Sequence, residues 1–381
     1  MVTRSFVAGF IAAPVATLAL HVAAPAAHAQ TFQTTANIPY GDGNARQVLD
    51  IHRPVAPFAA RRAVVLWIHG GGWSGGDKAM PAFRINALVA RGFVVASTNY
   101  RLSGTDLSPA QIHDCKAAVR FLRANADLYG IDPNRIGVWG SSAGGHLVAH
   151  LGVSHGVAEA EGTVGPHDGV SSRVQAVANY FGPADFFGVP GWATGEVNGV
   201  SNLLGFPLED AQANVNNPDW ADEVALTRLT QVVTHVTSDD APMYLAHGTA
   251  DTVVFPQHSQ NLFALLQAAG VPSTLRLVPG AGHGLPATED AAAIDFLVRA
   301  LAPCATDRTG DGRIDMPACD CVDFNRNTIF PEDQDVIAYL DVLAGAACDA
   351  CQDIDFNNNG VYPEDRDIID FFRVLAGGNC P

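Results

Sequence analysis

Residues 136–151 constrain the fold more than any other part of the chain. Ile136–Trp139 is a short apolar run with β-branched residues, which is typical of a buried strand. Gly-Ser-Ser-Ala-Gly follows at residues 140–144 and fits the pattern G-x-S-x-G, and residues 145–151 have the apolar spacing of a helix. A strand, a sharp turn with a serine and a helix form a nucleophile elbow. The segment therefore makes Ser142 a candidate nucleophile at the top of a sheet.

The glycines of this motif support that interpretation. Gly140 and Gly144 would let the strand and the helix approach each other closely across the turn. The helix dipole would favour negative charge that develops beside Ser142. The same letters also occur in Gly/Ser-rich turns of no catalytic importance, so the interpretation depends on partners elsewhere in the chain.

Strand-like and helix-like segments alternate through most of the chain, which predicts an α/β fold with a mostly parallel sheet covered on both faces. A Gly- and Pro-rich stretch from 181 to about 238 interrupts the alternation and is predicted to be an irregular cap or loop region bordering the site. The predicted strands are 47–52, 63–68, 93–98, 136–139, 174–180, 243–246 and 273–278, and the predicted helices are 81–91, 108–128, 145–151, 257–269 and 290–301.

A serine at such an elbow needs a histidine base and an acid that orients the base. In this architecture the chain order is serine, acid, histidine. Asp251 lies in a loop just after the strand predicted at 243–246, and His283 lies in a glycine-rich loop after the last predicted strand. We predict Asp251 as the acid and His283 as the base, with Asp185 as the alternative acid. The histidines in helical patterns are expected to be packed or solvated: His113, His146, His150 and His258.

The loop His69–Trp73 supplies a further part of such a site. It reads His-Gly-Gly-Gly-Trp and directly follows a run typical of a buried strand. Glycines let the backbone turn its N–H groups toward a substrate oxygen, and loops of this type form half of an oxyanion hole together with the N–H after the nucleophile. The predicted donors are Gly71, Gly72 and Ala143.

Taken together, residues 45–302 resemble an α/β-hydrolase of the esterase and lipase kind. His69–Trp73, Asn99–Leu102 and Trp139–His146 resemble the hormone-sensitive-lipase-like group, and still more the bifunctional feruloyl and acetylxylan esterases. The resemblance implies an α/β-hydrolase fold, a serine carboxylester hydrolase that acts through an acyl-serine, and no cofactor for catalysis. Ser141 stands where many lipolytic relatives carry Asp, which favours the carbohydrate-esterase branch.

The resemblance is less specific for the substrate. It implies a small-molecule or polysaccharide ester, with acetyl or feruloyl groups on polysaccharide as the favoured class. A lipase or arylesterase acting on small lipophilic esters, and a serine peptidase of the same fold, are the enzymatic alternatives. A surface-binding protein that keeps the hydrolase domain as a scaffold is the non-enzymatic alternative.

Residues 1–29 have the composition of an export signal. Arg4 supplies a positive start, residues 6–22 are apolar, and Ala27-His28-Ala29 is a small-x-small cleavage pattern. We predict cleavage after Ala29, a secreted, periplasmic or cell-surface location, and no membrane span after cleavage. An uncleaved membrane anchor is the alternative.

The net charge of −17 argues against a nucleic-acid partner. Residues 304–381 carry 16 Asp and Glu against 5 Arg, so we place a boundary between a catalytic domain at 30–303 and an acidic module at 304–381. Six of the 7 cysteines lie in this module, which predicts disulfides after export, with zinc as the alternative. Cys115 lies outside it and is expected to be a small buried thiol.

The acidic module contains a repeat, since residues 323–335 match residues 355–367. It resembles dockerin-type, EF-hand-like repeats, which implies structural calcium and an anchoring partner protein. Loop position 12 is Gln334 or Arg366 instead of an acid, so an Asn/Asp-rich turn held by disulfides is the alternative. The candidate calcium ligands, at loop positions 1, 3 and 5, are Asp323, Asn325, Asn327, Asp355, Asn357 and Asn359.

Overall fold

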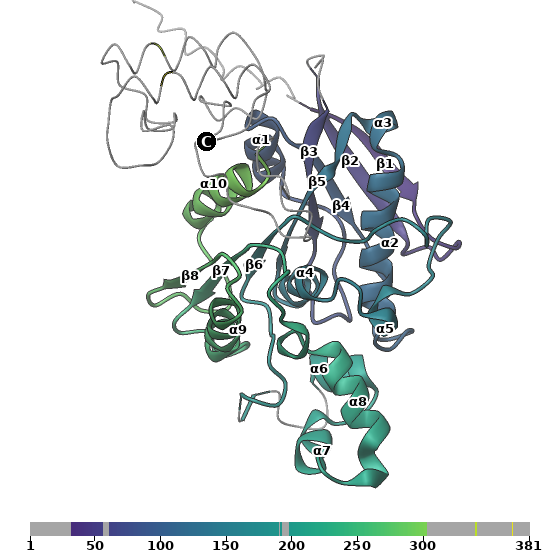
Figure 1. The fold of residues 1–381 in the computed structure, drawn as a ribbon, viewed down its shortest axis with the longest axis vertical. Coiled ribbons are helices and arrows are strands. Elements are labelled where there is room, and N and C mark those ends of the chain that lie inside the picture. The colour runs from purple at the N-terminus through teal and green to yellow at the C-terminus, as the bar shows by residue number, and fades with distance from the viewer. Residues whose placement is uncertain are drawn as a thin grey trace, which may run out of the picture. The chain divides into compact units, whose positions relative to one another are not determined.

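The computed structural model describes residues 32–55, 61–189, 191–192 and 198–302, together with Leu340 and Ile368. An eight-stranded sheet with the order β1-β2-β4-β3-β5-β6-β7-β8 is its centre (Figure 1). The strands are β1 (Phe32–Pro39), β2 (Val48–Pro54), β3 (Arg62–Ile68), β4 (Val94–Thr98), β5 (Ile131–Ser141), β6 (Ala176–Tyr180), β7 (Met243–Gly248) and β8 (Ser273–Val278).

The sheet is mostly parallel, as predicted. β1 pairs with β2 and β2 with β4 in antiparallel fashion, whereas every pair from β4 onward to β8 is parallel. The carboxyl ends of the parallel strands therefore meet at one edge, where the loops that follow them can build a common site. The first strand, β1, was not predicted, because most of its side chains are exposed and it has no apolar alternation.

Helices cover both faces of the sheet, and β3 shows how the two layers form. Val64, Leu66 and Ile68 belong to one core cluster, and Val65 and Trp67 belong to the other, because successive strand residues point to opposite faces. The first cluster includes residues of α2, α4 and α9, and the second includes residues of α1 and α10. These helices are α1 (Ala82–Ala90), α2 (Ala110–Ala124), α4 (Ala143–Val153), α9 (Gln257–Ala268) and α10 (Asp290–Ala300).

The stretch predicted to be irregular from 181 to 238 is largely helical where the structure describes it. The prediction was wrong on this point because the helices are short and lie between glycines and prolines, which obscure the helical period. Asn198 caps the first of them by accepting from the N–H groups of Val200 (3.0 Å) and Ser201 (2.9 Å). Its helices are α6 (Gly199–Leu204), α7 (Leu208–Ala213), η1 (Pro218–Trp220), α8 (Ala221–Thr230) and η2 (Val233–His235).

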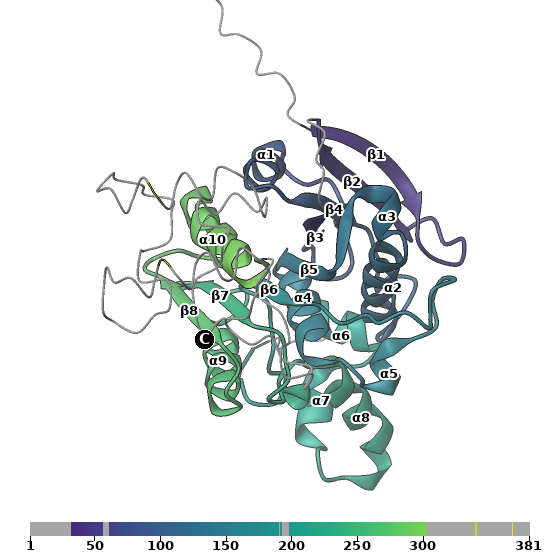
Figure 2. The same cartoon turned by 45° about the horizontal axis from the view of Figure 1, so that its top comes forward.

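Helices α6, α7 and α8 group together, apart from α1 and α10 (Figures 1 and 2). The remaining short helices are α3 (Ala126–Tyr129), α5 (Ala158–Glu161) and η3 (Ala287–Glu289). Within the described ranges, no helix has both the length and the apolar character required to cross a bilayer.

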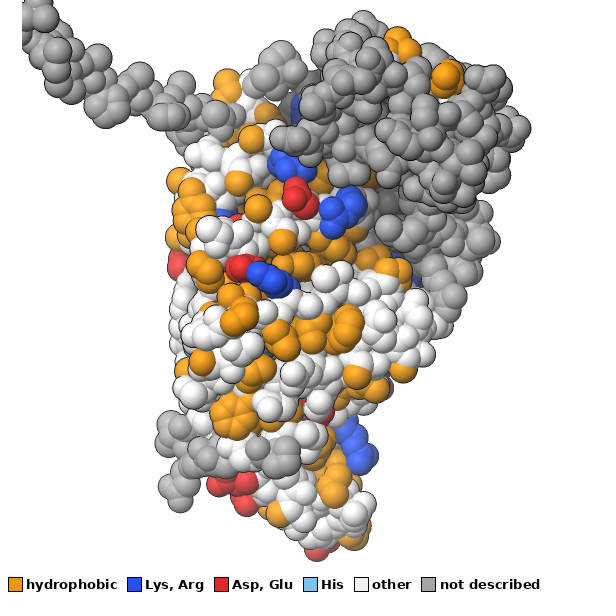
Figure 3. Space-filling view, turned by 90° about the vertical axis from the view of Figure 1, so that its left-hand side faces the viewer, with side chains coloured by type: hydrophobic (Ala, Val, Ile, Leu, Met, Phe, Trp, Pro, Cys, Tyr) orange, Lys and Arg blue, Asp and Glu red, His pale blue; other side chains and the backbone are white. Residues whose placement is uncertain are grey.

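One face of the described unit carries few charged side chains, several of them near a partner of opposite sign, among scattered hydrophobic ones (Figure 3). This agrees with the sequence, in which most of the excess negative charge follows residue 303. Cys115 is buried, as predicted, and burial raises the pKa of its thiol well above the ordinary value. The predicted export signal at 1–29 and the six candidate calcium ligands lie outside the described residues.

Candidate active site

Ser142 lies at a sharp turn between strand β5 and helix α4. Its backbone has φ 55° and ψ −123°, a conformation that L-residues rarely adopt and that persists only where the surrounding structure enforces it. The N–H of Ser142 donates to the carbonyl of Tyr180 (2.9 Å), and the N–H of His146 donates to the carbonyl of Ser142 (2.9 Å). Strand β6 and the first turn of α4 thus hold the serine in place.

The elbow glycines allow a close approach of backbones. A Cβ atom at Gly144 would overlap the carbonyl oxygens of Ile68 and His69, so α4 packs directly on the end of β3. A Cβ at Gly140 would lie 2.5 Å from the carbonyl oxygen of Gly144. The helix also begins at Ala143, two residues before its predicted start, so Gly144 belongs to its first turn.

The structure brings Ser142, Asp251 and His283 into one hydrogen-bonded chain. The Nδ1–H of His283 donates to Oδ2 of Asp251 (2.8 Å), and Nε2 of His283 lies 2.9 Å from Oγ of Ser142. The loops after β7 and β8 are tied together, since the N–H of Ala250 donates to the carbonyl of Ala281 (2.9 Å). Residues far apart in sequence therefore meet at the carboxyl edge of the sheet.

Asp185, the alternative acid, lies elsewhere in the fold. Its carboxylate accepts from the N–H of Gly188 (2.7 Å) and from the side-chain amide of Asn261 (2.8 Å). It therefore stabilises the turn that follows β6, and Asp251 is the carboxylate that contacts the histidine.

The carboxylate of Asp251 is buried and remains anionic. Burial raises the pKa of Asp251, but hydrogen bonds from His247, His283 and two backbone N–H groups outweigh that effect and hold the pKa below its ordinary value. The backbone donors are Val253 (2.9 Å) and Val254 (3.0 Å), both bonded to Oδ1. With Oδ1 held by the backbone, Oδ2 faces the imidazole of His283.

His247 is part of this network although it was not predicted from the sequence. Its side chain is fully buried on β7, with Nε2 at 2.8 Å from the carbonyl oxygen of Val254 and 3.4 Å from Oδ2 of Asp251. Its Nδ1 lies 2.7 Å from Oγ of Ser259. The sequence did contain a signal for His247, because a histidine stands inside an apolar strand four residues before the candidate acid.

The glycine loop after β3 lines the same cavity as the serine. Gly71 and Gly72 have φ values of 114° and 57°, which only glycine adopts readily. Together with Ala143 they line the cavity that contains Ser142 and His283. All three predicted oxyanion donors thus belong to the wall of the cavity around the serine.

The loop is anchored through the side chain of His69. Its Nδ1–H donates to the carbonyl of Gly70 (2.7 Å), and its Nε2 accepts from the guanidinium of Arg46 (3.2 Å). The ring also stacks on Tyr100, with centroids 4.4 Å apart. Burial lowers the pKa of His69 to about 4, so the imidazole is neutral and keeps both contacts near neutral pH.

The cavity around Ser142 has a volume of about 560 Å³. Its walls are mainly apolar, and Phe181 lies edge-on against His283 with centroids 4.9 Å apart. The N-terminus of α6 closes one side, so part of the stretch predicted to border the site does so. The apolar side chains of the lining are Trp73, Ala143, Phe181, Pro183, Trp192, Val200, Val253 and Val254.

His146, which follows Ser142 by one helical turn, has structural partners. His146 accepts from Nε1 of Trp73 (3.3 Å) and donates to the carbonyl of Thr230 (2.8 Å), so it is packed, as expected for a helical histidine. Among the residues that the structure describes, no group of three or more His, Cys, Asp and Glu side chains is arranged to hold a metal ion.

Comparison with known proteins shows that the chain is similar to esterases. The BD-FAE family matches residues 49–266. Esterase LipQ of Mycobacterium tuberculosis is 29% identical over 262 residues, which cover 68% of this chain and 59% of LipQ. The chain thus spans little more than half the length of LipQ and of two other curated esterases that it matches.

Two solved structures are similar over the same part of the chain. A truncated carbohydrate esterase from gut microbiota is 34% identical with a TM-score of 0.62, covering 71% of this chain and 98% of that one. An acetyl ester-xyloside bifunctional hydrolase from Caldicellulosiruptor lactoaceticus is 25% identical with a TM-score of 0.50, covering 66% of this chain and 85% of that one.

Proposed function

The chain belongs to the BD-FAE family of α/β-hydrolase esterases, and on this premise we propose that it hydrolyses carboxylic esters through an acyl-serine at Ser142. The observation that carries the proposal is the continuous hydrogen-bonded chain from Asp251 through His283 to the serine hydroxyl. Each group has the state that the chemistry requires: an anionic acid, an oriented imidazole and a serine held at a strained turn.

In the acylation half of the reaction, Oγ of Ser142 attacks the ester carbonyl while Nε2 of His283 takes the hydroxyl proton. Asp251 keeps the Nδ1–H tautomer of the imidazole and stabilises the imidazolium that forms. The negative charge on the former carbonyl oxygen is received by the N–H groups of Gly71, Gly72 and Ala143. Each such donor is worth about 3–4 kcal/mol of transition-state stabilisation.

The tetrahedral intermediate then collapses, and His283 gives the proton to the departing alcohol. In the deacylation half, the same imidazole takes a proton from water as the water attacks the acyl-serine, and it returns the proton to Ser142 as the carboxylic acid leaves. Apart from the ester and one water molecule, neither half requires a group from outside the protein.

We propose acyl esters of polysaccharide, such as acetyl or feruloyl esters, as the substrate class. The likeness to a carbohydrate esterase at 34% identity supports this assignment. The apolar wall formed by Phe181 and Trp192 in a cavity of about 560 Å³ also supports it, because such a wall accommodates an acetyl or an aromatic acyl group.

We further propose that the chain is exported with removal of residues 1–29, and that residues 304–381 form a disulfide-linked module that binds calcium and an anchoring protein. Support comes from the composition of the first segment and from the cysteines and repeats of the second. The mass of the exported protein, and calcium titration before and after Asp323→Ala with Asp355→Ala, test these proposals separately.

The test of the proposed activity uses p-nitrophenyl acetate and methyl ferulate with the full-length chain and with Ser142→Ala. We expect turnover by the unaltered chain, an acetyl adduct on Ser142 in rapidly quenched samples, and loss of both in the variant. Ser97→Ala is the control, because it removes a buried hydroxyl of strand β4 away from the site. Absence of turnover of both esters by a folded, unaltered chain would contradict the proposal.

A further inference from the structure

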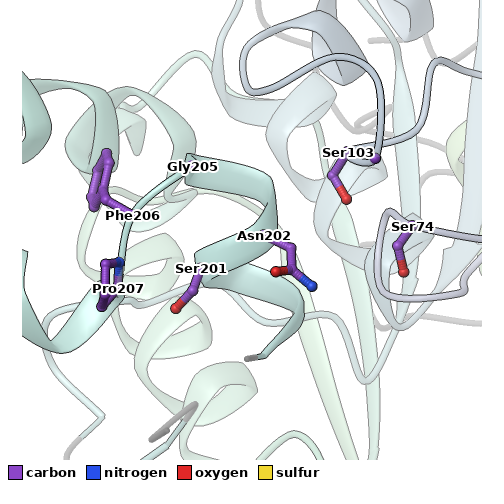
Figure 4. A pocket seen from close by; sticks show the side chains of 8 residues that line it. Ser74, Ser103, Ser201, Asn202, Gly205, Phe206 and Pro207 are labelled. Carbon is purple, nitrogen blue, oxygen red and sulfur yellow. The ribbon is translucent and has the colours of Figure 1, made fainter. Parts of the chain in front are cut away.

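A second cavity, of about 490 Å³, is lined by residues of the glycine loop, of the segment after β4 and of α6 (Figure 4). It neighbours the cavity that contains Ser142, because adjacent residues line the two: Trp73 lines the serine cavity and Ser74 the second, while Val200 lines the first and Ser201 the second. Its volume is within the range of about 300–1,000 Å³ that is common for ligand sites. The side chains that line it include Ser74, Ser103, Ser201, Asn202, Phe206 and Pro207.

Ser103 presents a buried hydroxyl to this cavity. The residue is 7% exposed, and among the described residues its Oγ has no hydrogen-bond partner. Its backbone N–H donates to the carbonyl of Trp73 (2.9 Å), which fixes Ser103 against the glycine loop. Buried hydroxyls are normally paired, and this unpaired one belongs to a residue that lines a cavity, so it points to an external partner.

Two further polar groups are directed to the same place. Figure 4 shows the amide of Asn202 extending from α6 toward the loop of Ser74, with the hydroxyl of Ser103 directed toward the gap between them. The amide of Asn202 is exposed, whereas Ser74 makes only a long contact of 3.5 Å with the carbonyl of Gly71. Asn202 and Ser74 are therefore open to a bound molecule, and Ser103 adds a buried, unpaired hydroxyl in the wall beside them.

The chemistry of the lining selects the class of ligand. Of the described residues that line the cavity, none is charged, which disfavours phosphate, a carboxylate or a metal ion as the occupant. Serine hydroxyls and an asparagine amide both donate and accept hydrogen bonds. A neutral ligand with many hydroxyl groups, each of which also donates and accepts, matches that set.

We propose that this second cavity binds sugar units of an acylated oligosaccharide, next to the unit whose ester lies at Ser142. The inference rests on the proposed ester hydrolysis and adds a specificity site to it. Ser103 and Asn202 bind the sugar and take no part in making or breaking bonds. Esters of simple alcohols do not reach this cavity and are hydrolysed without it.

The test compares acetylated xylo-oligosaccharides with p-nitrophenyl acetate for the double variant Ser103→Ala with Asn202→Ala. We expect kcat/KM for the oligosaccharide to fall roughly tenfold through a higher KM, since two hydrogen bonds are lost. We expect kcat/KM for p-nitrophenyl acetate to stay within about twofold. Ser97→Ala is the matched control, because its buried hydroxyl also has no partner among the described residues but lies on β4.

A second variant, Gly104→Phe, fills the cavity. Gly104 is exposed at the cavity edge with open space where a Cβ would stand, so the change leaves the fold intact. We expect it to weaken the binding of unacetylated xylotriose to the Ser142→Ala chain, measured by calorimetry. The calorimetric result does not depend on catalysis.

The outcomes separate the two proposals. If p-nitrophenyl acetate is hydrolysed while neither variant changes oligosaccharide turnover or xylotriose binding, the sugar site is wrong and the esterase stands. If no ester is hydrolysed but Gly104→Phe abolishes xylotriose binding, the cavity is a sugar site and the proposed activity is wrong. A loss of activity toward both esters in the double variant would also overturn the specificity role.

Discussion

His247 and Asp251 lie with Nε2 and Oδ2 only 3.4 Å apart, so one carboxylate oxygen faces two imidazoles, that of His247 and that of His283. The carbonyl of Val254, which lies 2.8 Å from Nε2 of His247, can only accept, so this nitrogen carries a proton. Nδ1 of His247 is then the acceptor for the hydroxyl of Ser259 (2.7 Å). The carboxylate of Asp251 is therefore oriented by His247 on strand β7 as well as by the backbone of the loop that follows the strand.

This arrangement makes His247 a positioning residue for the acid. We expect His247→Phe to lower kcat roughly tenfold with KM unchanged, because a hydrogen bond to a charged group is lost and Asp251 gains freedom to rotate. His247→Gln keeps a donor in the strand and is expected to recover part of the rate. Steady-state kinetics on p-nitrophenyl acetate provide the measurement, and equal losses in both variants would show that only packing matters.

Buried histidines make the fold sensitive to acid. Burial lowers the pKa of His146 to about 4 and of His258 to about 3, and it lowers the pKa of His150 well below its ordinary value. Because the unfolded chain binds more protons in this range, their contribution to stability is complete above about pH 6.5 and is lost as the pH falls toward 4. Urea unfolding between pH 7 and pH 4 should show a steadily decreasing free energy of unfolding.

His150 offers a variant that isolates this effect. Neither ring nitrogen has a hydrogen-bond partner among the described residues. We expect His150→Leu to be as stable as the unaltered chain at pH 7 and to lose less stability at pH 4, since a buried group that titrates has been removed. His167→Leu, at a partly exposed site, is the control. An unchanged slope in His150→Leu would refute the assignment.

Gly144→Ala tests the close contact at the elbow. The added Cβ would overlap two backbone carbonyl oxygens of the β3 end, and backbone cannot rotate away as a side chain can. We expect the free energy of unfolding to fall by about 1–3 kcal/mol and esterase activity to be lost. Gly169→Ala is the control, because a Cβ there meets open space and the backbone φ is ordinary. Equal stability of the two variants would count against the contact.

Asp290 forms a buried ion pair with Arg84 that joins α10 to α1. The guanidinium bonds both carboxylate oxygens, at 2.7 Å and 3.0 Å. We expect Asp290→Ala to destabilise the fold by about 1.5–3 kcal/mol, because the partly buried Arg84 loses hydrogen bonds to a charged partner. Arg276→Ala breaks a nearby pair with Glu289 at an exposed arginine and should leave the melting temperature unchanged. Differential scanning calorimetry of both variants measures the two melting temperatures, and equal values would contradict this prediction.

The sequence predicted well those elements whose signal is local. Strands β3 and β7 are continuous apolar runs, and the elbow combines a strand, glycines and a helix within a few residues, so Ser142 could be found before its partners. Asp251 and His283 could then be predicted from the order serine, acid, histidine along the chain. Strand β5 begins at Ile131, earlier than predicted, because Asp132-Pro133-Asn134 is typical of a turn.

Features that depend on distant contacts could not be predicted. The partners of His247 come from a loop and from α9, so its place in the network exists only after the sheet has formed. The unpaired hydroxyl of Ser103 could not be predicted from the sequence, because a missing hydrogen-bond partner becomes visible only in the folded chain. The short helices α6 and α7 have six residues each and are stabilised by packing, and α6 also by its Asn198 cap, more than by their own composition.

The position of β8 at the edge of the sheet has a consequence for how the protein loses activity on heating. This strand has one neighbour, β7, and most of its side chains are partly or fully exposed, yet the loop after it carries His283. Edge strands open at a lower free energy than the centre of a sheet. Detachment of β8 alone would remove the base from Ser142 while the other strands stay paired, so heat inactivation precedes the melting of the domain.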